Sequence, residues 1–252
     1  MKPVSFIRLP VIAMQNPNIK CNDTNEFVNR YIRLRKLEGR LYSDEEVSML
    51  PDISEEHIHK AEWRIRKESC RRLIKYLAKK KKRFSILEIG CGNGWLSNQM
   101  ASIKNAQVTG IDINVMELNQ AKRVFVKPNL TFLQKNIDDL RELRFDIIVF
   151  ASSIQYFSQI QKTIKNCFRI MKDKGEIHII DTHFYSTKDI GQAKIRSHTY
   201  FQNIGQEVMD SFYFHHSLDD LKGLRVQTFN RYYLWTKFSR ISIPFPWLCI
   251  TR

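Results

Sequence analysis

The stretch Phe84-Ser-Ile-Leu-Glu-Ile-Gly-Cys-Gly-Asn-Gly-Trp95 decides the fold of this chain. Its first six residues predict a buried strand, and three glycines with the spacing G-x-G-x-G then break the strand before a helix begins. A dinucleotide site uses G-x-G-x-x-G, with a pyrophosphate held at the helix N-terminus. Here Trp95 stands at the position of that third glycine, and an acid, Glu88, precedes the first glycine by two residues. The loop therefore favours a ligand that carries an ammonium group and no phosphate.

Strands and helices alternate after this stretch. We expect helices at 95–103, 115–126 and 155–171, and strands at 84–89, 107–112, 131–133, 145–150 and 176–181. Short Val- and Ile-rich strands separated by helices predict right-handed crossovers and a parallel sheet. Two late strands, at 226–238 and 241–250, are expected to add antiparallel strands at its edge, and Lys172-Asp-Lys-Gly175 is expected to form a turn. The predicted fold class is α/β, with a Rossmann-like, seven-stranded, mostly parallel sheet and flanking helices.

An N-terminal helical extension is expected before the sheet. Its helices are predicted at 25–37, from the cap Ser43 to Pro51, and from Ser54 to about Lys80. A further helix is predicted at 188–206, between the fifth strand and the late strands. The expected division is a cap at 1–80 and a ligand-binding domain at 81–252, with a substrate-lid insertion at about 184–222.

Composition limits where the protein works and what it contains. The chain has 252 residues, of which 43% are apolar, enough for one sizeable domain. It lacks the run of roughly 18 apolar residues that a membrane-spanning helix needs, and Arg8 and Pro10 interrupt its start, so we expect no signal peptide. The five cysteines are widely spaced without a C-x-x-C pair, which favours a reducing cytoplasm and predicts no disulfide framework and no zinc site. Oligomeric state stays open.

The formal net charge is +15, and it is concentrated in one segment. Between Lys60 and Arg83 there are twelve Lys and Arg residues against two Glu. A nucleic acid, an anionic membrane surface or an acidic substrate is one interpretation of this face. A solvated helix end is the other, since cations near a helix C-terminus interact favourably with its dipole.

Polar residues follow two further strands. Asp112 lies 22 residues after Gly90, near the offset expected for an acid that binds ribose hydroxyls, and Asn136 follows the next strand. Alone, Asp112 is equally a helix cap and Asn136 a turn residue. Ligands of open α/β sheets bind at the carboxyl ends of the strands, so the order of these residues on successive strands predicts one site.

From about Phe84 to Thr182 the sequence resembles the class I S-adenosylmethionine (SAM)-dependent methyltransferases. Leu87 to Gly94 matches that family's first motif, and Phe145-Asp-Ile-Ile-Val-Phe-Ala-Ser-Ser its fourth-strand pattern. The resemblance implies SAM as cofactor. It implies that Glu88 and the Gly90 backbone hold the methionine portion and that Asp112 binds the ribose hydroxyls. It also implies that Ile113, Asn136 and the Ile137 backbone contact adenine, and that Ala151 or Ser152 lies beside the methyl donor. The cofactor-binding residues it implies are Glu88, Gly90, Cys91, Gly92, Gly94, Asp112, Ile113, Asn136, Ile137 and Ala151.

The acceptor is less well defined by the sequence. Amino-directed nucleic-acid methyltransferases carry Asn/Asp-Pro-Pro-aromatic after the fourth strand, where this chain has Ala151-Ser-Ser-Ile154, and no catalytic cysteine stands at a strand end. We therefore expect methyl transfer to an O or N atom of a small-molecule metabolite. An RNA methyltransferase that uses the basic 60–83 face and a non-catalytic SAM-binding protein are the alternatives.

Candidate residues for the acceptor side lie outside the matched motifs. Tyr156 and His183 are the catalytic candidates, because each follows a strand end, although a hydrogen-bonded histidine is an equal interpretation of His183. The candidate substrate contacts are Trp63, Arg66, His198, Tyr200 and His215. For Trp63, a core position is the favoured interpretation. The histidines between 183 and 216 lack a His-x₃-His or acid-paired spacing, so no metal is expected.

Overall fold

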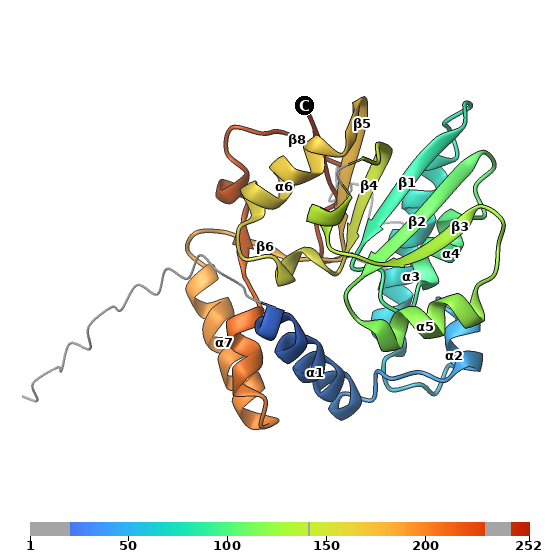
Figure 1. The fold of residues 1–252 in the computed structure, drawn as a ribbon. Helices are drawn as coiled ribbons and strands as arrows, with labels where there is room; N and C mark the ends of the chain where they lie inside the picture. Colours follow the sequence, from blue (N-terminus) through green and yellow to red (C-terminus); the bar gives the residue numbers. More distant parts are fainter. Residues whose placement is uncertain (1–20, 141, 230–242) are drawn as a thin grey trace, which may run out of the picture.

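The computed structural model describes residues 21–140, 142–229 and 243–252. From Phe84 onward, strands and helices alternate as the sequence predicts (Figure 1). These elements are β1 (Phe84–Ile89), α4 (Trp95–Met100), β2 (Ala106–Asp112), α5 (Val115–Val124), β3 (Leu130–Gln134), η1 (Ile137–Asp139), β4 (Phe145–Ala151), η2 (Ile154–Tyr156), α6 (Ile160–Arg169) and β5 (Met171–Ile180).

A seven-stranded sheet with the order β3-β2-β1-β4-β5-β9-β8 forms the centre of the molecule. Strands β1 to β5 pair in parallel, whereas β9 (Leu248–Thr251) is antiparallel to both β5 and β8 (Arg225–Thr228). The predicted fold class is therefore confirmed. The two late strands are shorter than the predicted 226–238 and 241–250, and residues 230–242 lie outside the described residues.

Helices cover both faces of this sheet. Apolar side chains of α3 (Lys60–Leu77), α4 and α5 pack on one face, where alternate residues such as Ile86 and Val108 point toward them. The other face packs against α6 through Ile160, Ile164 and Cys167. Because both faces are buried, the central strands are nearly continuous apolar runs.

Most predicted boundaries agree with the structure to within about four residues, and three further ones differ by more. The helix expected from Ser54 begins at Lys60, because side chains hold the preceding turn: His57 Nδ1 accepts the backbone N–H of His59 at 3.0 Å, and His59 Nε2 lies 2.6 Å from Glu38 O. The helix expected at 155–171 begins only at Ile160, after η2. The turn expected at 172–175 lies within β5, where the register with β4 shifts.

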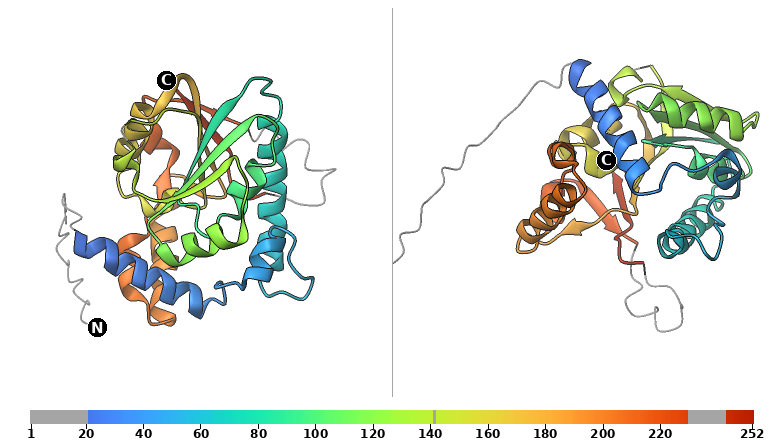
Figure 2. Two further views of the ribbon diagram at one scale, coloured as in Figure 1. Left: turned by 45° about the vertical axis from the view of Figure 1, so that its right-hand side comes forward. Right: turned by 90° about the horizontal axis from the view of Figure 1, so that it is seen from below.

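The N-terminal helices are α1 (Cys21–Leu37), α2 (Asp44–Met49) and α3. Ser43 caps α2 as predicted, in a reciprocal capping box with Glu46. Seen from the end of the sheet where β1 meets its glycine loop, α1 crosses beside the strand ends (Figure 2).

The segment between β5 and β8 lies at the same end of the molecule. It contains β6 (Phe184–Tyr185), α7 (Ile190–Asn203), η3 (Glu207–Phe212), β7 (His216–Ser217) and η4 (Leu218–Leu221). Leu34 of α1 packs with Phe201 of α7 and Met209 of η3 in a small core of their own. The division into a cap, a domain and a lid stays a prediction. In the described ranges, every helix is too short or too polar to cross a membrane.

The glycine loop offers a stability test. Gly94 has φ +77°, and a Cβ there would lie 2.5 Å from Cζ of Phe132 and 2.8 Å from Cβ of Ala121. Gly94→Ala should lower the free energy of unfolding by about 2–4 kcal/mol, through strain and overpacking. Gly191→Ala, on α7 with no neighbour within 4 Å, should instead raise it by up to about 1 kcal/mol. Equal denaturant midpoints for the two variants would contradict this account of the loop.

Candidate active site

The glycine loop between β1 and α4 has three left-handed residues and packs against the end of β4. Gly90, Gly92 and Gly94 have φ of +73°, +51° and +77°, which L side chains rarely adopt. A Cβ on Gly90 would lie 2.7 Å from Cβ of Ser153, whose hydroxyl donates to Ile89 O at 2.6 Å. The side chain of Cys91 is buried in the hydrophobic core. Its predicted contact with the cofactor stays a prediction.

Glu88 is a buried acid at the end of β1. Only 3% of its surface is exposed, and Ser97 Oγ of α4 donates to Oε2 at 2.5 Å. Burial raises the pKa of Glu88 to about 8, and the nearby Asp112 adds to the shift. The charged form of a carboxyl group buried here is costly unless a ligand supplies a cation beside it.

Asp112 ties the end of β2 to the glycine loop. Its Oδ2 accepts the backbone N–H of Gly92 at 2.8 Å, and its Oδ1 accepts that of Asn114 at 2.8 Å. Burial raises the pKa of Asp112, although these N–H donors lower it in part. Ile113 is half-buried next to it. Their predicted contacts with ribose and adenine stay predictions.

The structure adds Glu117, which sequence reasoning missed. This acid of the first turn of α5 is buried, accepts from Asn114 Nδ2 at 2.9 Å, and would lie 3.5 Å from a Cβ on Gly92. Burial raises its pKa to about 7 and nearby Arg35 of α1 lowers it in part. The sequence signal was ambiguous, because acids in a first helical turn commonly serve the helix dipole.

The adenine side of the predicted site lies at the end of β3. Asn136 is exposed and caps η1, with Oδ1 accepting the N–H of Ile137 at 2.7 Å. The side chain of Ile137 is buried. The backbone donor assigned to the adenine ring is thus engaged by Asn136 in this structure, and the two roles stay predictions.

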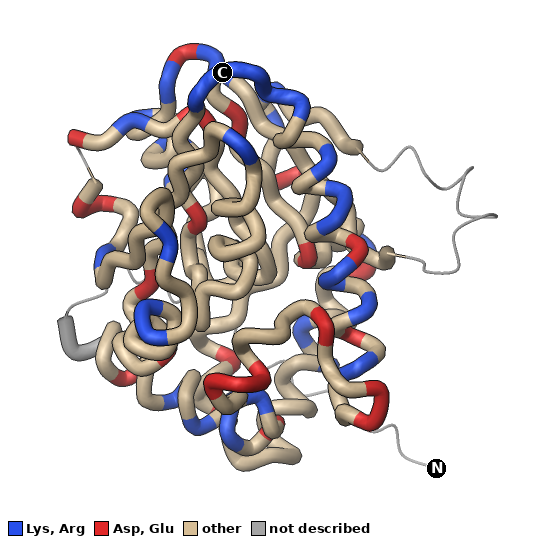
Figure 3. The backbone as a smooth tube through the Cα atoms, turned by 90° about the vertical axis from the view of Figure 1, so that its right-hand side faces the viewer, with Lys and Arg blue, Asp and Glu red and all other residues tan. Residues whose placement is uncertain are grey.

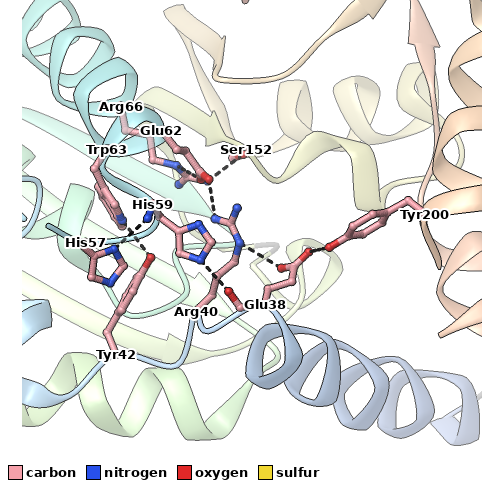
Figure 4. A network of polar contacts seen from close by, with 10 residues as sticks. All are labelled: Glu38, Arg40, Tyr42, His57, His59, Glu62, Trp63, Arg66, Ser152 and Tyr200. Atoms are coloured by element: carbon pink, nitrogen blue, oxygen red, sulfur yellow. Dashed lines mark hydrogen bonds and ion pairs between the residues drawn. The ribbon is translucent and has the colours of Figure 1, made fainter. Parts of the chain in front are cut away.

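At the end of β4, Ala151 is half-buried, and Ser152 has a φ of +55°. Arg66 of α3 donates to Ser152 Oγ at 3.2 Å, and its guanidinium lies 5.4 Å from the ring centroid of Trp63. Figure 4 shows that Arg66 belongs to a polar chain that reaches α7. Its successive bonds, of 2.5, 3.1, 2.6, 2.8 and 3.2 Å, join Tyr200, Glu38, Arg40, Glu62, Arg66 and Ser152.

Tyr156 lies in an aromatic cluster under α1. Its ring centroid is 5.5 Å from Phe27, 5.7 Å from Tyr31 and 5.9 Å from Tyr213. Burial raises the pKa of Tyr156, so its hydroxyl is neutral at physiological pH. The cluster joins α1 and the segment after β5 to the end of β4.

The structure disperses the other acceptor-side candidates. His183 is exposed, 4.6 Å from the ring centroid of Phe245, and burial of part of its ring lowers its pKa. Nδ1 of His198, on α7, lies 3.2 Å from Oδ2 of Asp210, on η3. His215 lies 2.9 Å from Ser197 Oγ and lines a cavity of about 1020 Å³ between α6 and α7.

Trp63 is part of the core. It is 3% exposed, its ring centroid lies 5.1 Å from that of Trp95, and its Nε1–H donates to Tyr42 Oη at 2.9 Å. These contacts are those of a packing residue. Its predicted contact with substrate stays a prediction.

Glu176, His178 and Cys249 form a second polar cluster, where β5 meets β9, that the sequence did not reveal. Their ligand atoms lie within 4.8 Å of one another. However, Trp247 Nε1–H donates to His178 Nδ1 at 3.1 Å, which leaves the ring proton on Nε2, 3.1 Å from Glu176. A ring nitrogen that carries its proton cannot ligate a metal, so we interpret the cluster as a polar bridge across strands.

Known proteins resemble this chain in sequence and in fold. A family model described as a methyltransferase domain matches residues 80–223. A malonyl-[acyl-carrier protein] O-methyltransferase of Priestia megaterium is 27% identical over 95 residues, which cover 37% of this chain and 35% of that protein. A ubiquinone biosynthesis O-methyltransferase of Coxiella burnetii is 31% identical over 106 residues, covering 40% and 42%. The matches thus span less than half the length of these relatives.

Among solved structures, magnesium protoporphyrin IX methyltransferase of Synechocystis, with bound SAM, aligns with a TM-score of 0.56. Its sequence identity is 13%, over 93% of this chain and 100% of that one. Because the family model matches more than half of the chain, the chain belongs to the methyltransferase-domain family. Its fold is that of the class I SAM-dependent methyltransferases, whose cofactor is SAM.

The raised pKa of Glu88 makes a prediction about the protein without ligand. A carboxyl whose pKa rises from 4.5 unfolded to about 8 folded contributes stability below pH 4.5 that is lost as pH rises through 8. The melting temperature should therefore fall between pH 6 and pH 9. Glu88→Gln should flatten that fall, whereas Glu207→Gln, an exposed control on η3, should not. An unchanged pH profile in Glu88→Gln would refute the assignment.

Proposed function

We propose that the protein transfers a methyl group from SAM to an oxygen or nitrogen atom of a small-molecule acceptor. The observation that carries this proposal is a set of three carboxyl groups around the glycine loop with raised pKa values: Glu88 and Glu117, which are buried, and Asp112, which is half-buried. The charge of Asp112 raises the pKa of both Glu88 and Glu117, since like charges repel. A ligand with an ammonium and a sulfonium group, and without phosphate, would relieve this repulsion.

The residues of the site fit such a ligand. The left-handed glycines let the backbone approach it, and Asp112 fixes the loop through Gly92 N–H. SAM, when bound, supplies an activated methyl group on sulfur. What remains for the protein is positioning of the acceptor, which accounts for most of the rate in such transfers. Ser152 and Tyr156 follow the end of β4, and this position supports the proposal that they border the acceptor.

The cavity beside α7 supports a small-molecule acceptor. It is lined by residues of the segment after β5, including Tyr213, whose ring also packs on Tyr156. The segment assigned to a substrate lid thus reaches the end of β4. The two relatives are named malonyl-[acyl-carrier protein] O-methyltransferase and ubiquinone biosynthesis O-methyltransferase, and these names support transfer to an oxygen atom.

An RNA methyltransferase is the second candidate, because of the basic 60–83 face. Lys and Arg gather along α3 and where the strands begin, with acids between them (Figure 3). Six of the basic residues pair with acids: Lys60, Arg64, Arg66, Lys67, Arg71 and Lys80. The exposed run Lys81 to Arg83 precedes β1, about 20 Å from the glycine loop at its other end. This position does not favour a phosphate track into the site.

A non-catalytic SAM-binding protein is the third candidate, since fold alone does not establish turnover. We also propose a cytoplasmic location. The free, buried thiols of Cys70, Cys91, Cys167 and Cys249 support a reducing compartment.

Binding of the cofactor is the first test. Calorimetry should detect SAM and its demethylated product, and Glu88→Ala and Asp112→Ala should each weaken the binding by about tenfold or more. Binding should also release protons near neutral pH, because a cationic ligand lowers the raised pKa of Glu88. The exposed Asp173→Ala serves as control. Absence of heat on folded wild-type protein would refute the proposal.

Turnover separates the three candidates. With methyl-labelled SAM and a cell extract, a small molecule should gain one methyl group. Label in RNA, together with binding that weakens steeply as salt rises, would favour the second candidate. Binding of SAM without label in any extract component would favour the third.

A further inference from the structure

The cavity between α6 and α7 is lined by three lysines without an acid partner. They are Lys162 and Lys165 of α6 and Lys194 of α7. The spacing of Lys162 and Lys165 places both side chains on one face of α6, so they reach the same side of the cavity. Within residues 21–140, 142–229 and 243–252, none of the three lysines forms an ion pair or a side-chain hydrogen bond.

The acids that line the same cavity are engaged by other groups. Asp210 lies 3.2 Å from the histidine of α7, and Asp219 lies 3.1 Å from Lys222, outside the cavity lining. Asp220 accepts the backbone N–H of Ser217 at 2.7 Å, in the capping box of η4. The lysine charges are therefore not matched at close range by the protein, and a negatively charged ligand is attracted to such a cavity.

The N-terminal end of α6 adds to this positive character. Gln159, Ile160 and Gln161 line the cavity, so the ten-residue helix begins in its wall. The N-cap residue Gln159 gives the helix no side-chain hydrogen bond. The N–H groups of a first helical turn carry a partial positive charge, which the charge of the lysines reinforces.

Two aromatic lining residues connect the cavity to the end of β4. The ring centroid of Tyr213 lies 5.9 Å from that of Tyr156, and the N–H of Phe214 donates to Gln155 O at 2.7 Å. The cavity thus adjoins the residues proposed to border the acceptor. Its volume of about 1020 Å³ is enough for a small molecule that contacts both the lysines and these rings.

We propose that this cavity binds the acceptor and that the acceptor carries a phosphate or carboxylate group, separate from the atom that is methylated, which Lys162, Lys165 and Lys194 hold. This inference rests on the proposed methyl transfer and names the substrate class. Phosphates and carboxylates accept charge-assisted hydrogen bonds from ammonium groups and from helix N-termini. A neutral acceptor would leave the lysines unmatched, and a cationic one would be repelled. The anionic group itself is unchanged by the reaction.

His215, which also lines the cavity, reports on such a ligand. Burial and the charge of Lys194 lower the pKa of its ring. The titratable groups around the ring are Lys194 and Arg196 of α7, Asp210 of η3, His216 of β7, and Tyr185 and Tyr213. An anion bound beside Lys194 favours the protonated ring, so the pKa of His215 should rise when the site is filled.

This binding can be tested without turnover. Inorganic phosphate and citrate are the probes, and sodium chloride at equal ionic strength is the comparison. Followed by NMR on the full chain, the pKa of His215 should rise with either probe and not with chloride. The double variant Lys162→Gln/Lys194→Gln should abolish the rise. Lys188→Gln, an exposed lysine that does not line the cavity, is the matched control and should keep it. No rise in wild type with either probe would overturn the lysine site.

Turnover tests the substrate class. With methyl-labelled SAM and a cell extract, the labelled product of low molecular mass should bind an anion exchanger at pH 7. Phosphatase treatment should release a phosphate ester, whereas a carboxylate should be released only by acid, below its pKa of about 4. With the purified acceptor, Lys162→Gln/Lys194→Gln should raise KM by about tenfold or more and leave kcat within about threefold. Its affinity for SAM, its denaturant midpoint and both kinetic constants of Lys188→Gln should match wild type.

The outcomes separate this inference from the proposed function. A labelled product that is neutral or cationic at pH 7, or an unchanged KM in the double variant, would overturn the anionic acceptor and leave methyl transfer standing. Wild type that fails to bind SAM, or that binds it without labelling any component, would overturn the proposed function itself.

Discussion

The carboxylate of Asp112 accepts the backbone N–H of Gly92 at 2.8 Å, and through this bond the end of β2 holds the loop that follows β1. The backbone N–H groups of Gly90 and Cys91 also donate to Ile111 O of β2, at 2.9 and 3.0 Å, and together these bonds offset the conformational entropy that the glycines lose on ordering. Once the loop is fixed, α4 starts at Trp95 and brings Ser97 against Glu88. The site thus depends on the hydrogen bonds from the end of β2 to the loop, of which the bond to Asp112 is the charge-assisted one.

Burial of acids is the electrostatic consequence of this arrangement. Glu88 and Glu117 are buried and Asp112 is half-buried, and loss of solvation disfavours the charged form of each. Two arginines, Arg35 and Arg66, moderate this from α1 and α3, and Arg35 itself keeps a buried Nε without a partner among the described residues. A site that is strained in this way without ligand is suited to bind a cation.

The polar chain in Figure 4 connects α7 with the residues that follow β4. It runs from Tyr200 on α7 through Arg40 to Arg66, beside Ser152. Its side chains come from four separate elements, and each holds its neighbour at hydrogen-bond distance. The segment after β5 is therefore positioned with respect to the end of β4 by polar contacts as well as by the aromatic cluster around Tyr156.

Most of the fold could be predicted from the periodicity of apolar residues and the spacing of the glycines. The strands from 84 to 151 and the cap at Ser43 were predictable, because each rests on neighbours in sequence. The helix from Lys60 was misjudged at its start, since long-range bonds such as His59 to Glu38 hold the preceding turn. The bulge in β5 also escaped prediction, because the register of one strand against another is not a local property.

The sequence by itself determined the sheet, the glycine loop and the acids at the ends of β1 and β2, because these follow from local pattern and chain order. Only the tertiary structure decided which distant groups meet there. It placed Glu117 opposite Gly92 and Arg66 beside Ser152. Burial, which sets the charge state of each acid, depends on the packing of α1 and α3 over the strand ends, and no spacing of residues along the chain encodes it.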